Sequence, residues 1–214
     1  MNDALTPARP LAGLLAPIAA AVLMACGGET SQLPKPRAYP RIEFPEGEPT
    51  SLALEVCPFD FQRPAYALVE RDTTYFDEAP KHPCWFDLVT PQLNGRVHFS
   101  YYPIASAAAF EELRDDAFDL AGKHTIVANY IDEQPIARPD AGVYGFAFDI
   151  EGDVASPFQF YVTDSARHFL RGAVYVNAQA RADSLAPVYA FLREDALEAV
   201  GTLEWEGGVI FVDR

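Results

Sequence analysis

Residues 142–177 read GVYGFAFDIEGDVASPFQFYVTDSARHFLRGAVYVN, and this stretch decides the fold. Its aromatic and β-branched residues fall into three runs, 142–150, 156–163 and 168–177, separated by short polar segments, which is the pattern of consecutive strands. Glu151-Gly152-Asp153 is a turn sequence, so we expect the first two runs to form an antiparallel hairpin. The centre of the fold is therefore predicted to be an antiparallel sheet.

Two amphipathic helices are predicted, one before and one after this stretch. The first is capped by Ser106 and runs to about Tyr130, and one face carries Phe110, Leu113, Ala117, Leu120 and His124 at helical spacing. The second is capped by Asp183, and its apolar face carries Leu185, Val188, Leu192, Ala196 and Val200. Each helix has one face to bury against the sheet.

Shorter strands are predicted on both sides of the helices, at 41–44, 51–57, 65–70, 95–102 and 209–212. Residues 71–91 read as a long loop, because charged residues and prolines cluster around Lys81-His82-Pro83. In the strand at 95–102, Val97, Phe99 and Tyr101 share one face. The sequence thus predicts an α+β fold, a mainly antiparallel sheet packed against two amphipathic helices, in a single domain of residues 41–214.

The first 25 residues have the features of an export signal. The apolar run at 11–25 is shorter than the roughly 20 residues of a permanent membrane helix, and Pro17 interrupts it. Leu23-Met24-Ala25 precedes Cys26 and resembles the lipobox of bacterial lipoproteins. We therefore expect residues 1–25 to be removed and Cys26 to carry the lipid, palmitate among its acyl chains, which anchors the chain in a bilayer. An ordinary secretory signal before a chance cysteine is the alternative.

Residues 26–40 are predicted to be a tether between the lipid and the domain. Glycine and polar residues give way to prolines spaced two apart, as in a flexible chain that stiffens into polyproline. A proline-rich recognition site for a partner is the alternative. Gly27 stands where an inner-membrane retention signal would place Asp, so we expect the protein in the cell envelope, on the periplasmic face of the outer membrane.

The number of cysteines predicts a disulfide, and the net charge argues against one class of partner. Cys57 and Cys84 remain after the lipid site, and an even pair in an oxidising compartment predicts a single disulfide, with two free buried thiols as the alternative. The net charge of −15 argues against a nucleic-acid partner, because that binding needs clustered Lys and Arg. An acidic surface favours solubility, and cation binding is the alternative reading.

The sequence predicts no metal site and no catalytic triad. The histidines have no second His or Cys three to five residues away, as a zinc site usually has; they are His82, His98, His124 and His168. Thr163 to His168 contains serine, histidine and aspartate, but a triad usually draws these from separated loops, and no Gly-x-Ser-x-Gly elbow is present. A capped turn, in which Asp164 and Ser165 bond their own backbone, is the interpretation we prefer.

Arg171 is a charged residue in an otherwise apolar strand. It shares a face with Tyr175, whereas His168 lies on the opposite face. We expect Arg171 to pair with an acid such as Asp149, and contact with a partner is the alternative.

The chain also resembles a known family, the gliding-motility lipoproteins called GldD of Bacteroidota, over most of its mature length. The matching stretches are Pro34-Lys35-Pro36 with Tyr39 to Ile42, Cys57-Pro58-Phe59 with Phe61, Pro64 with Tyr66, Cys84-Trp85, Gly95 to Tyr101, Lys123-His124, Val143-Tyr144-Gly145, Ala155-Ser156, Gln159-Phe160, Thr163-Asp164-Ser165, His168 to Ala173, and Asp183-Ser184-Leu185. The last third carries the most specific matches.

The resemblance implies a non-catalytic accessory lipoprotein of gliding motility and type IX protein secretion, which needs no cofactor and docks on other envelope proteins. The candidate partner-binding residues in the matching stretches are Trp85, His98, Asp164, Ser165, His168 and Arg171. Two alternatives remain open. A periplasmic hydrolase would gather His98, Asp164, Ser165 and His168 in one pocket, and a small-ligand or cation-binding lipoprotein would bind its ligand only in the native state.

Overall fold

The computed structural model describes residues 41–71, 80–126, 128–178 and 182–206, and the side chains of all of these except Ile126 and Ala182. The described residues form one seven-stranded sheet in the order β4-β5-β6-β10-β9-β8-β7, and every neighbouring pair is antiparallel. Its strands are β4 (Leu68–Arg71), β5 (Trp85–Thr90), β6 (Gly95–Pro103), β7 (Ala128–Arg138), β8 (Val143–Gly152), β9 (Phe158–Thr163) and β10 (His168–Val176). The predicted α+β class is confirmed.

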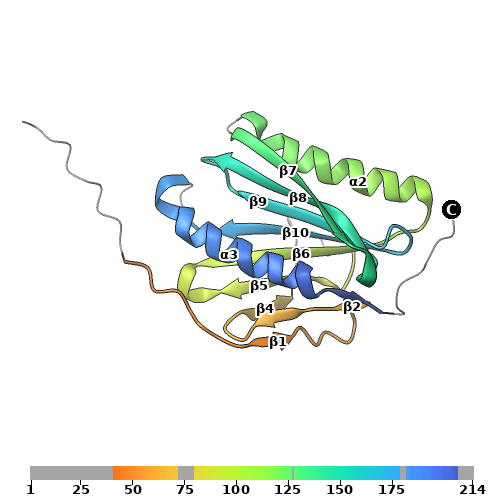
Figure 1. Cartoon of the computed structure of the whole chain (residues 1–214), viewed down its shortest axis with the longest axis horizontal. Helices are drawn as coiled ribbons and strands as arrows, with labels where there is room; N and C mark the ends of the chain where they lie inside the picture. The colour runs from red at the N-terminus through yellow and green to blue at the C-terminus, as the bar shows by residue number, and fades with distance from the viewer. Residues whose placement is uncertain (1–40, 72–79, 127, 179–181, 207–214) are drawn as a thin grey trace, which may run out of the picture. The chain divides into compact units, whose positions relative to one another are not determined.

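Two helices cover the sheet, α3 (Ala182–Thr202) on one face and α2 (Ala107–Gly122) on the other. Strand β10 shows the division, because Leu170 and Val174 belong to the core cluster with α3 and Phe169 belongs to the cluster with α2. Figure 1 shows α3 crossing the strands in front of β6 and β10. Large apolar side chains project from both faces of the sheet, so a helix must cover each face to shield them from water.

Short elements complete the fold. Two small sheets pair β1 (Pro49–Ser51) with β3 (Gln62–Pro64), and β2 (Phe59–Asp60) with β11 (Glu204–Trp205). Three 3-10 turns are η2 (Pro91–Leu93), η3 (Lys123–Ile126) and η4 (Pro139–Ala141). The small sheets hold the ends of the described chain against the α3 side of the core, since Phe59 and Trp205 are both buried there.

The hairpin and the start of the first helix agree with the sequence analysis, whereas α3 begins at Ala182 and has Asp183 in its first turn instead of at its cap. Strands β8 and β9 pair antiparallel, and Val97, Phe99 and Tyr101 of β6 are all buried on one face. Ser106 caps α2, with its Oγ accepting a hydrogen bond from the Ala109 backbone N–H at 3.2 Å. Such a cap stabilises a helix start by about 1 kcal/mol.

The first predicted helix is too long, and a strand was missed. Helix α2 ends at Gly122, and residues 128–138, whose first part was assigned to that helix, form β7. β7 lies at the edge of the sheet, where a strand tolerates Pro135 and keeps Asp132 and Glu133 in solvent or at its boundary. These residues hide the alternation by which a strand is recognised.

The predicted loop at 71–91 is also wrong in its second half. Trp85–Thr90 is β5, which pairs with β6 and buries Phe86 and Leu88. The cluster of prolines and charges that suggested a loop lies before the strand and ends at Pro83, and within β5 only Asp87 is charged. Residues 72–79 lie outside the described residues.

Three of the predicted short strands need correction. Residues 41–44 form no strand, and only Ser51 of the strand predicted at 51–57 lies in β1. The strand predicted at 65–70 is observed as the shorter β4, Leu68–Arg71. Ala53 has a φ of 53°, a left-handed conformation that ends a strand. The strand predicted at 209–212, the signal peptide at 1–25 and the tether at 26–40 lie outside the described residues.

A disulfide joins Cys57 and Cys84, as predicted from the even pair of cysteines that remains after the lipid site, and both side chains are buried. Their Cα atoms are 5.4 Å apart. The bridge ties the segment before β2 to the start of β5. In the chain-entropy treatment a loop of this size stabilises the fold by about 3.5 kcal/mol.

The segment that enters the fold packs on α3. Phe44 stacks on Phe191 with ring centroids 4.9 Å apart, and Tyr66 stacks on the same ring at 5.8 Å. The Tyr66 hydroxyl donates a hydrogen bond to Asp195 Oδ1 at 2.7 Å. Burial, together with the negative charges of Glu198 and Glu194, raises the pKa of Asp195 to about 6, although the Tyr66 hydrogen bond opposes this.

We expect Asp195→Asn to stabilise the protein at neutral pH. The pKa of Asp195 is higher in the folded state than the 3.8 of the unfolded state, so ionisation above pH 6 costs stability and protonation below pH 4 removes that cost. After allowance for partial exposure, the gain is about 1–2 kcal/mol, or roughly 2–6 °C in Tm. Thermal unfolding at pH 8 and pH 4 checks this; equal gains at both pH values would contradict it.

Candidate functional site

The candidate residues fall into two groups that the fold keeps apart. Trp85, His98 and Arg171 lie on the α2 side of the sheet, whereas Asp164, Ser165 and His168 lie in or beside the turn between β9 and β10. His98 pairs with Ala173, five residues along β10 from His168, which is a separation of roughly 17 Å. The four residues of the hydrolase alternative are therefore not gathered in one pocket.

The turn between β9 and β10 is built on Asp164. Its carboxylate accepts hydrogen bonds from the backbone N–H groups of Ala166, Arg167 and His168 at 3.0, 2.7 and 2.8 Å. Burial raises the pKa of Asp164, but these three donors outweigh it and leave the pKa below its usual value. The carboxylate is thus a fixed anion that closes the turn, as the sequence predicts.

Ser165 is a turn residue in a left-handed conformation, with φ of 65°. Its backbone N–H donates to Thr163 Oγ1 at 2.8 Å, and the Thr163 hydroxyl donates to the His168 carbonyl at 2.6 Å. No hydrogen bond joins the Ser165 and His168 side chains in the described part of the chain. A serine nucleophile would need that bond to be activated.

His168 is buried in an aromatic block. Its Nδ1 bonds the Tyr101 hydroxyl at 2.8 Å, and its ring stacks on Trp205 at 5.2 Å, while Nε2 is buried with no hydrogen-bond partner among the described residues. Burial lowers the pKa of His168, and the attraction of Asp164 only partly opposes this, so the ring is neutral at neutral pH.

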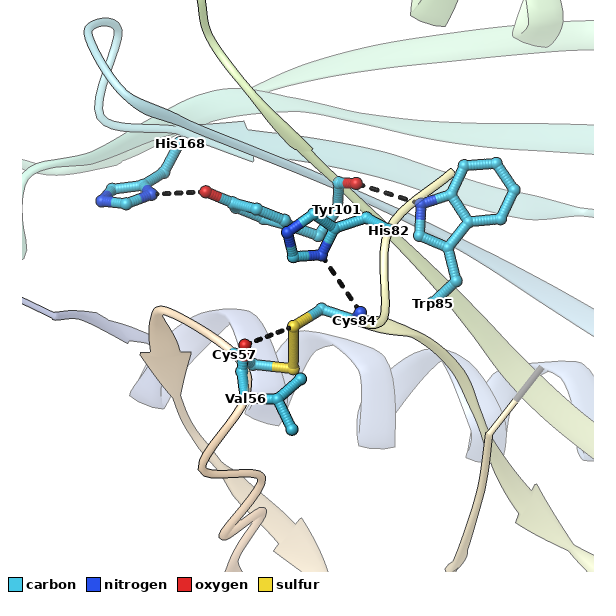
Figure 2. Close-up of a disulfide and its surroundings, with 7 residues drawn as sticks. All are labelled: Val56, Cys57, His82, Cys84, Trp85, Tyr101 and His168. Carbon is cyan, nitrogen blue, oxygen red and sulfur yellow. Dashed lines mark hydrogen bonds between the residues drawn. A yellow bond between two sulfur atoms is a disulfide. The ribbon is translucent and has the colours of Figure 1, made fainter. Parts of the chain in front are cut away.

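The same block reaches the disulfide, and the backbone of Tyr101 joins it to Trp85 on the other face of the sheet (Figure 2). His82 accepts a hydrogen bond from the Cys84 backbone N–H at 3.1 Å and meets the Tyr101 ring edge-on at 4.8 Å. The Trp85 indole N–H donates to the Tyr101 carbonyl at 3.0 Å, and Trp85 is only 4% exposed. Trp85 and His168 therefore lie in the interior, where they brace β5, β6 and β10.

Arg171 belongs to a second group of polar side chains, on the α2 side of the sheet. Its Nη2 donates to Gln159 Oε1 at 2.5 Å, and the Gln159 amide nitrogen lies 2.9 Å from His124 Nε2. Burial lowers the pKa of His124, and the charge of Arg171 lowers it further. His124 is therefore a neutral acceptor at the end of this chain of hydrogen bonds.

The expected pairing of Arg171 with Asp149 is wrong. Asp149 accepts hydrogen bonds from Arg193 Nε and Nη2 at 2.6 and 2.7 Å. Asp149 pairs with Phe158 in the sheet, and both point toward α3, whereas Arg171 points toward the α2 side. The sheet itself separates the two side chains.

His98 lies beside this group. Its Nδ1 is 2.7 Å from Asp87 Oδ1, and Arg96 Nη1 donates to Asp87 Oδ2 at 2.7 Å. Burial raises the pKa of Asp87, but its bonds to His98 and Arg96 outweigh that and lower the pKa. We call this set the polar face; its members are Asp87, Arg96, His98, His124, Gln159 and Arg171.

His124 was weighed in the sequence analysis only as a zinc ligand, and three other members of the polar face, the strand residues Asp87, Arg96 and Gln159, were not singled out there. Asp87 and His98 stand opposite each other in β5 and β6, and Gln159 and Phe148 in β9 and β8. The signal was present, because each is a polar residue at an alternate position of a buried strand. The strand order needed to bring them together was not known.

The described residues contain no group of three or more His, Cys, Asp or Glu side chains that could hold a metal ion. Within the same residues, no helix is both long enough and apolar enough to cross a membrane.

The comparison with known families identifies the chain. No curated protein matches the sequence. A family model described as gliding motility lipoprotein GldD matches residues 29–205, which include every described strand and both helices. The chain therefore belongs to the GldD family of gliding motility lipoproteins.

Proposed function

We propose that this protein is a non-catalytic accessory component of gliding motility and type IX protein secretion, held at the periplasmic face of the outer membrane by the acylated Cys26. The observation that carries the proposal is the family match over residues 29–205. The domain of residues 41–214 acts by docking on other envelope proteins of that machinery. Residues 1–25 export the chain, and residues 26–40 are the tether.

The state of the side chains supports a role in binding rather than catalysis. The Asp164 carboxylate is occupied by three backbone donors, and His168 is buried against Trp205. On the polar face, the Asp87 carboxylate is hydrogen-bonded to His98 and Arg96. Acid–base catalysis needs a group that can reach a substrate and exchange a proton near neutral pH, and these groups are committed to the fold.

Deletion of the gene in the source organism tests the role. We expect the deletion strain to lose both surface spreading and secretion of type IX cargo, and a plasmid copy to restore both. Cargo in the culture medium is measured by immunoblotting and spreading by colony diameter. Normal secretion in the deletion strain would reject the proposal.

A complementing Ser165→Gly copy tests whether the Ser165 hydroxyl takes part in the function. Glycine accepts the left-handed conformation of residue 165 and removes the hydroxyl, so the fold should keep its full stability. We expect this copy to restore secretion fully. A stable Ser165→Gly protein that fails to restore secretion would show that the hydroxyl acts directly, as the nucleophile of the hydrolase alternative or as a contact to the partner.

A further inference from the structure

Arg171 occupies the middle of the sheet, on β10, the fourth of the seven strands. Its side chain is half-buried. Withdrawing a cation from water costs several kcal/mol unless a partner compensates it, and the usual partner is a carboxylate. Among the described residues, Arg171 has no carboxylate within ion-pair distance, and its hydrogen-bond partner is the neutral Gln159.

Other arginines of the fold show what is unusual about Arg171. Carboxylates hold Arg96, Arg114, Arg167 and Arg193, while Arg138 donates to the carbonyls of Val200 and Leu203 at the end of α3, both at 2.9 Å. The sequence has 31 acidic residues against 16 Lys and Arg. In such an acidic protein, an arginine without a carboxylate at the centre of a sheet points to a partner from outside.

The guanidinium of Arg171 is held in place. Gln159 is 2% exposed, its oxygen accepts from Arg171, and its nitrogen donates to His124. This direction of hydrogen bonding fixes the orientation of the amide. The Arg171 Nε and Nη1 atoms form no hydrogen bond within the described residues, and neither is among the fully buried atoms without a partner, so each keeps some contact with solvent. Held donors of this kind lose little entropy on binding.

The chemistry of the site favours a carboxylate over a phosphate. A carboxylate offers two coplanar oxygens to one edge of a guanidinium, and here that edge is formed by Nη1 or Nε together with the second N–H of Nη2, whose first N–H is bonded to Gln159. A phosphate dianion would need a second cation, and neutral His124 does not supply one. It would also meet more repulsion from a protein whose net charge is −15.

We propose that Arg171 is a carboxylate-binding residue, and that its occupant is an acidic side chain of the envelope protein on which this domain docks. This rests on the proposed function for the identity of the partner. Gln159 and His124 are positioning residues, which aim the guanidinium and do not touch the partner.

Chemical modification of the full-length lipoprotein in detergent tests the site without any variant. Phenylglyoxal reacts with accessible guanidinium groups, and mass spectrometry reports the rate at each arginine. Arg193 is the matched control, because its side chain is partly exposed but bonded to Asp149 through two nitrogens. We expect Arg171 to react several-fold faster than Arg193, and sodium acetate to slow it relative to sodium chloride at equal ionic strength. Equal rates at the two arginines, or protection by inorganic phosphate that exceeds protection by acetate, would overturn the proposal.

Complementation of the deletion strain tests the occupant. We expect Arg171→Gln to lose spreading and secretion to the level of the deletion strain while the folded protein accumulates normally, and Arg114→Gln, which removes an exposed arginine of α2, to behave as wild type. If deletion abolishes secretion but folded Arg171→Gln restores it, the carboxylate contact is rejected and the proposed function stands. If deletion leaves secretion intact, the proposed function falls, and the acetate result alone decides the site.

Discussion

Gly145→Ala should destabilise the protein by more than about 3 kcal/mol, the range of the most damaging core substitutions. Gly145 lies in β8 opposite Val162 of β9. A Cβ added there would come closer than 3.0 Å to the carbonyl oxygen of Tyr161, a backbone atom that cannot move without breaking the sheet. The expected loss in Tm is roughly 6–12 °C for a domain of this size, measured by thermal unfolding.

Gly201→Ala is the matched control. Gly201 lies near the end of α3, and nothing stands within 4 Å of an added Cβ. The same substitution should therefore raise stability slightly, by up to about 1 kcal/mol, because alanine favours the helix. A Gly145→Ala protein that melts within a degree of wild type would show that β8 and β9 do not approach each other as described.

Parts of this fold could be predicted because their signals are local. The hairpin of β8 and β9 carries its turn in the sequence, and the cap at Ser106 marks the start of α2. Strand β7 could not be recognised locally. Its position at the edge of the sheet, with α2 on one side, is what allows Pro135 and its charged neighbours there.

The candidate site shows the limit of pattern reading more clearly. Alternation along β10 correctly placed Arg171 and His168 on opposite faces. Alternation alone does not show whether Asp149 of β8 lies on the same face as Arg171 of β10, because the faces of different strands can be compared only when their register is known. The register of β8 with β9 turns Asp149 toward α3, where it meets Arg193. The same missing register concealed the contact between Gln159 and Arg171.

In the proposed function, a lipid on Cys26 holds the domain where it docks. Each buried methylene of an acyl chain contributes about 0.8 kcal/mol to membrane attachment, so two or three chains make release negligible. A domain confined to the membrane meets its partners at a far higher effective concentration than a free one. Loss of the lipid should therefore abolish function even though the fold is untouched.

The direct measurement uses a Cys26→Ala chain exported behind an ordinary cleavable secretory signal, in the deletion strain. Labelled palmitate should enter the wild-type protein and not this variant, and the variant should fractionate with soluble periplasmic proteins. We expect it to fold with the wild-type Tm and yet to support neither spreading nor type IX secretion, while a lipidated cysteine from another outer-membrane lipoprotein, placed at position 26 with its own signal, restores both. A soluble, unlipidated protein that secretes cargo at the wild-type level would contradict the account.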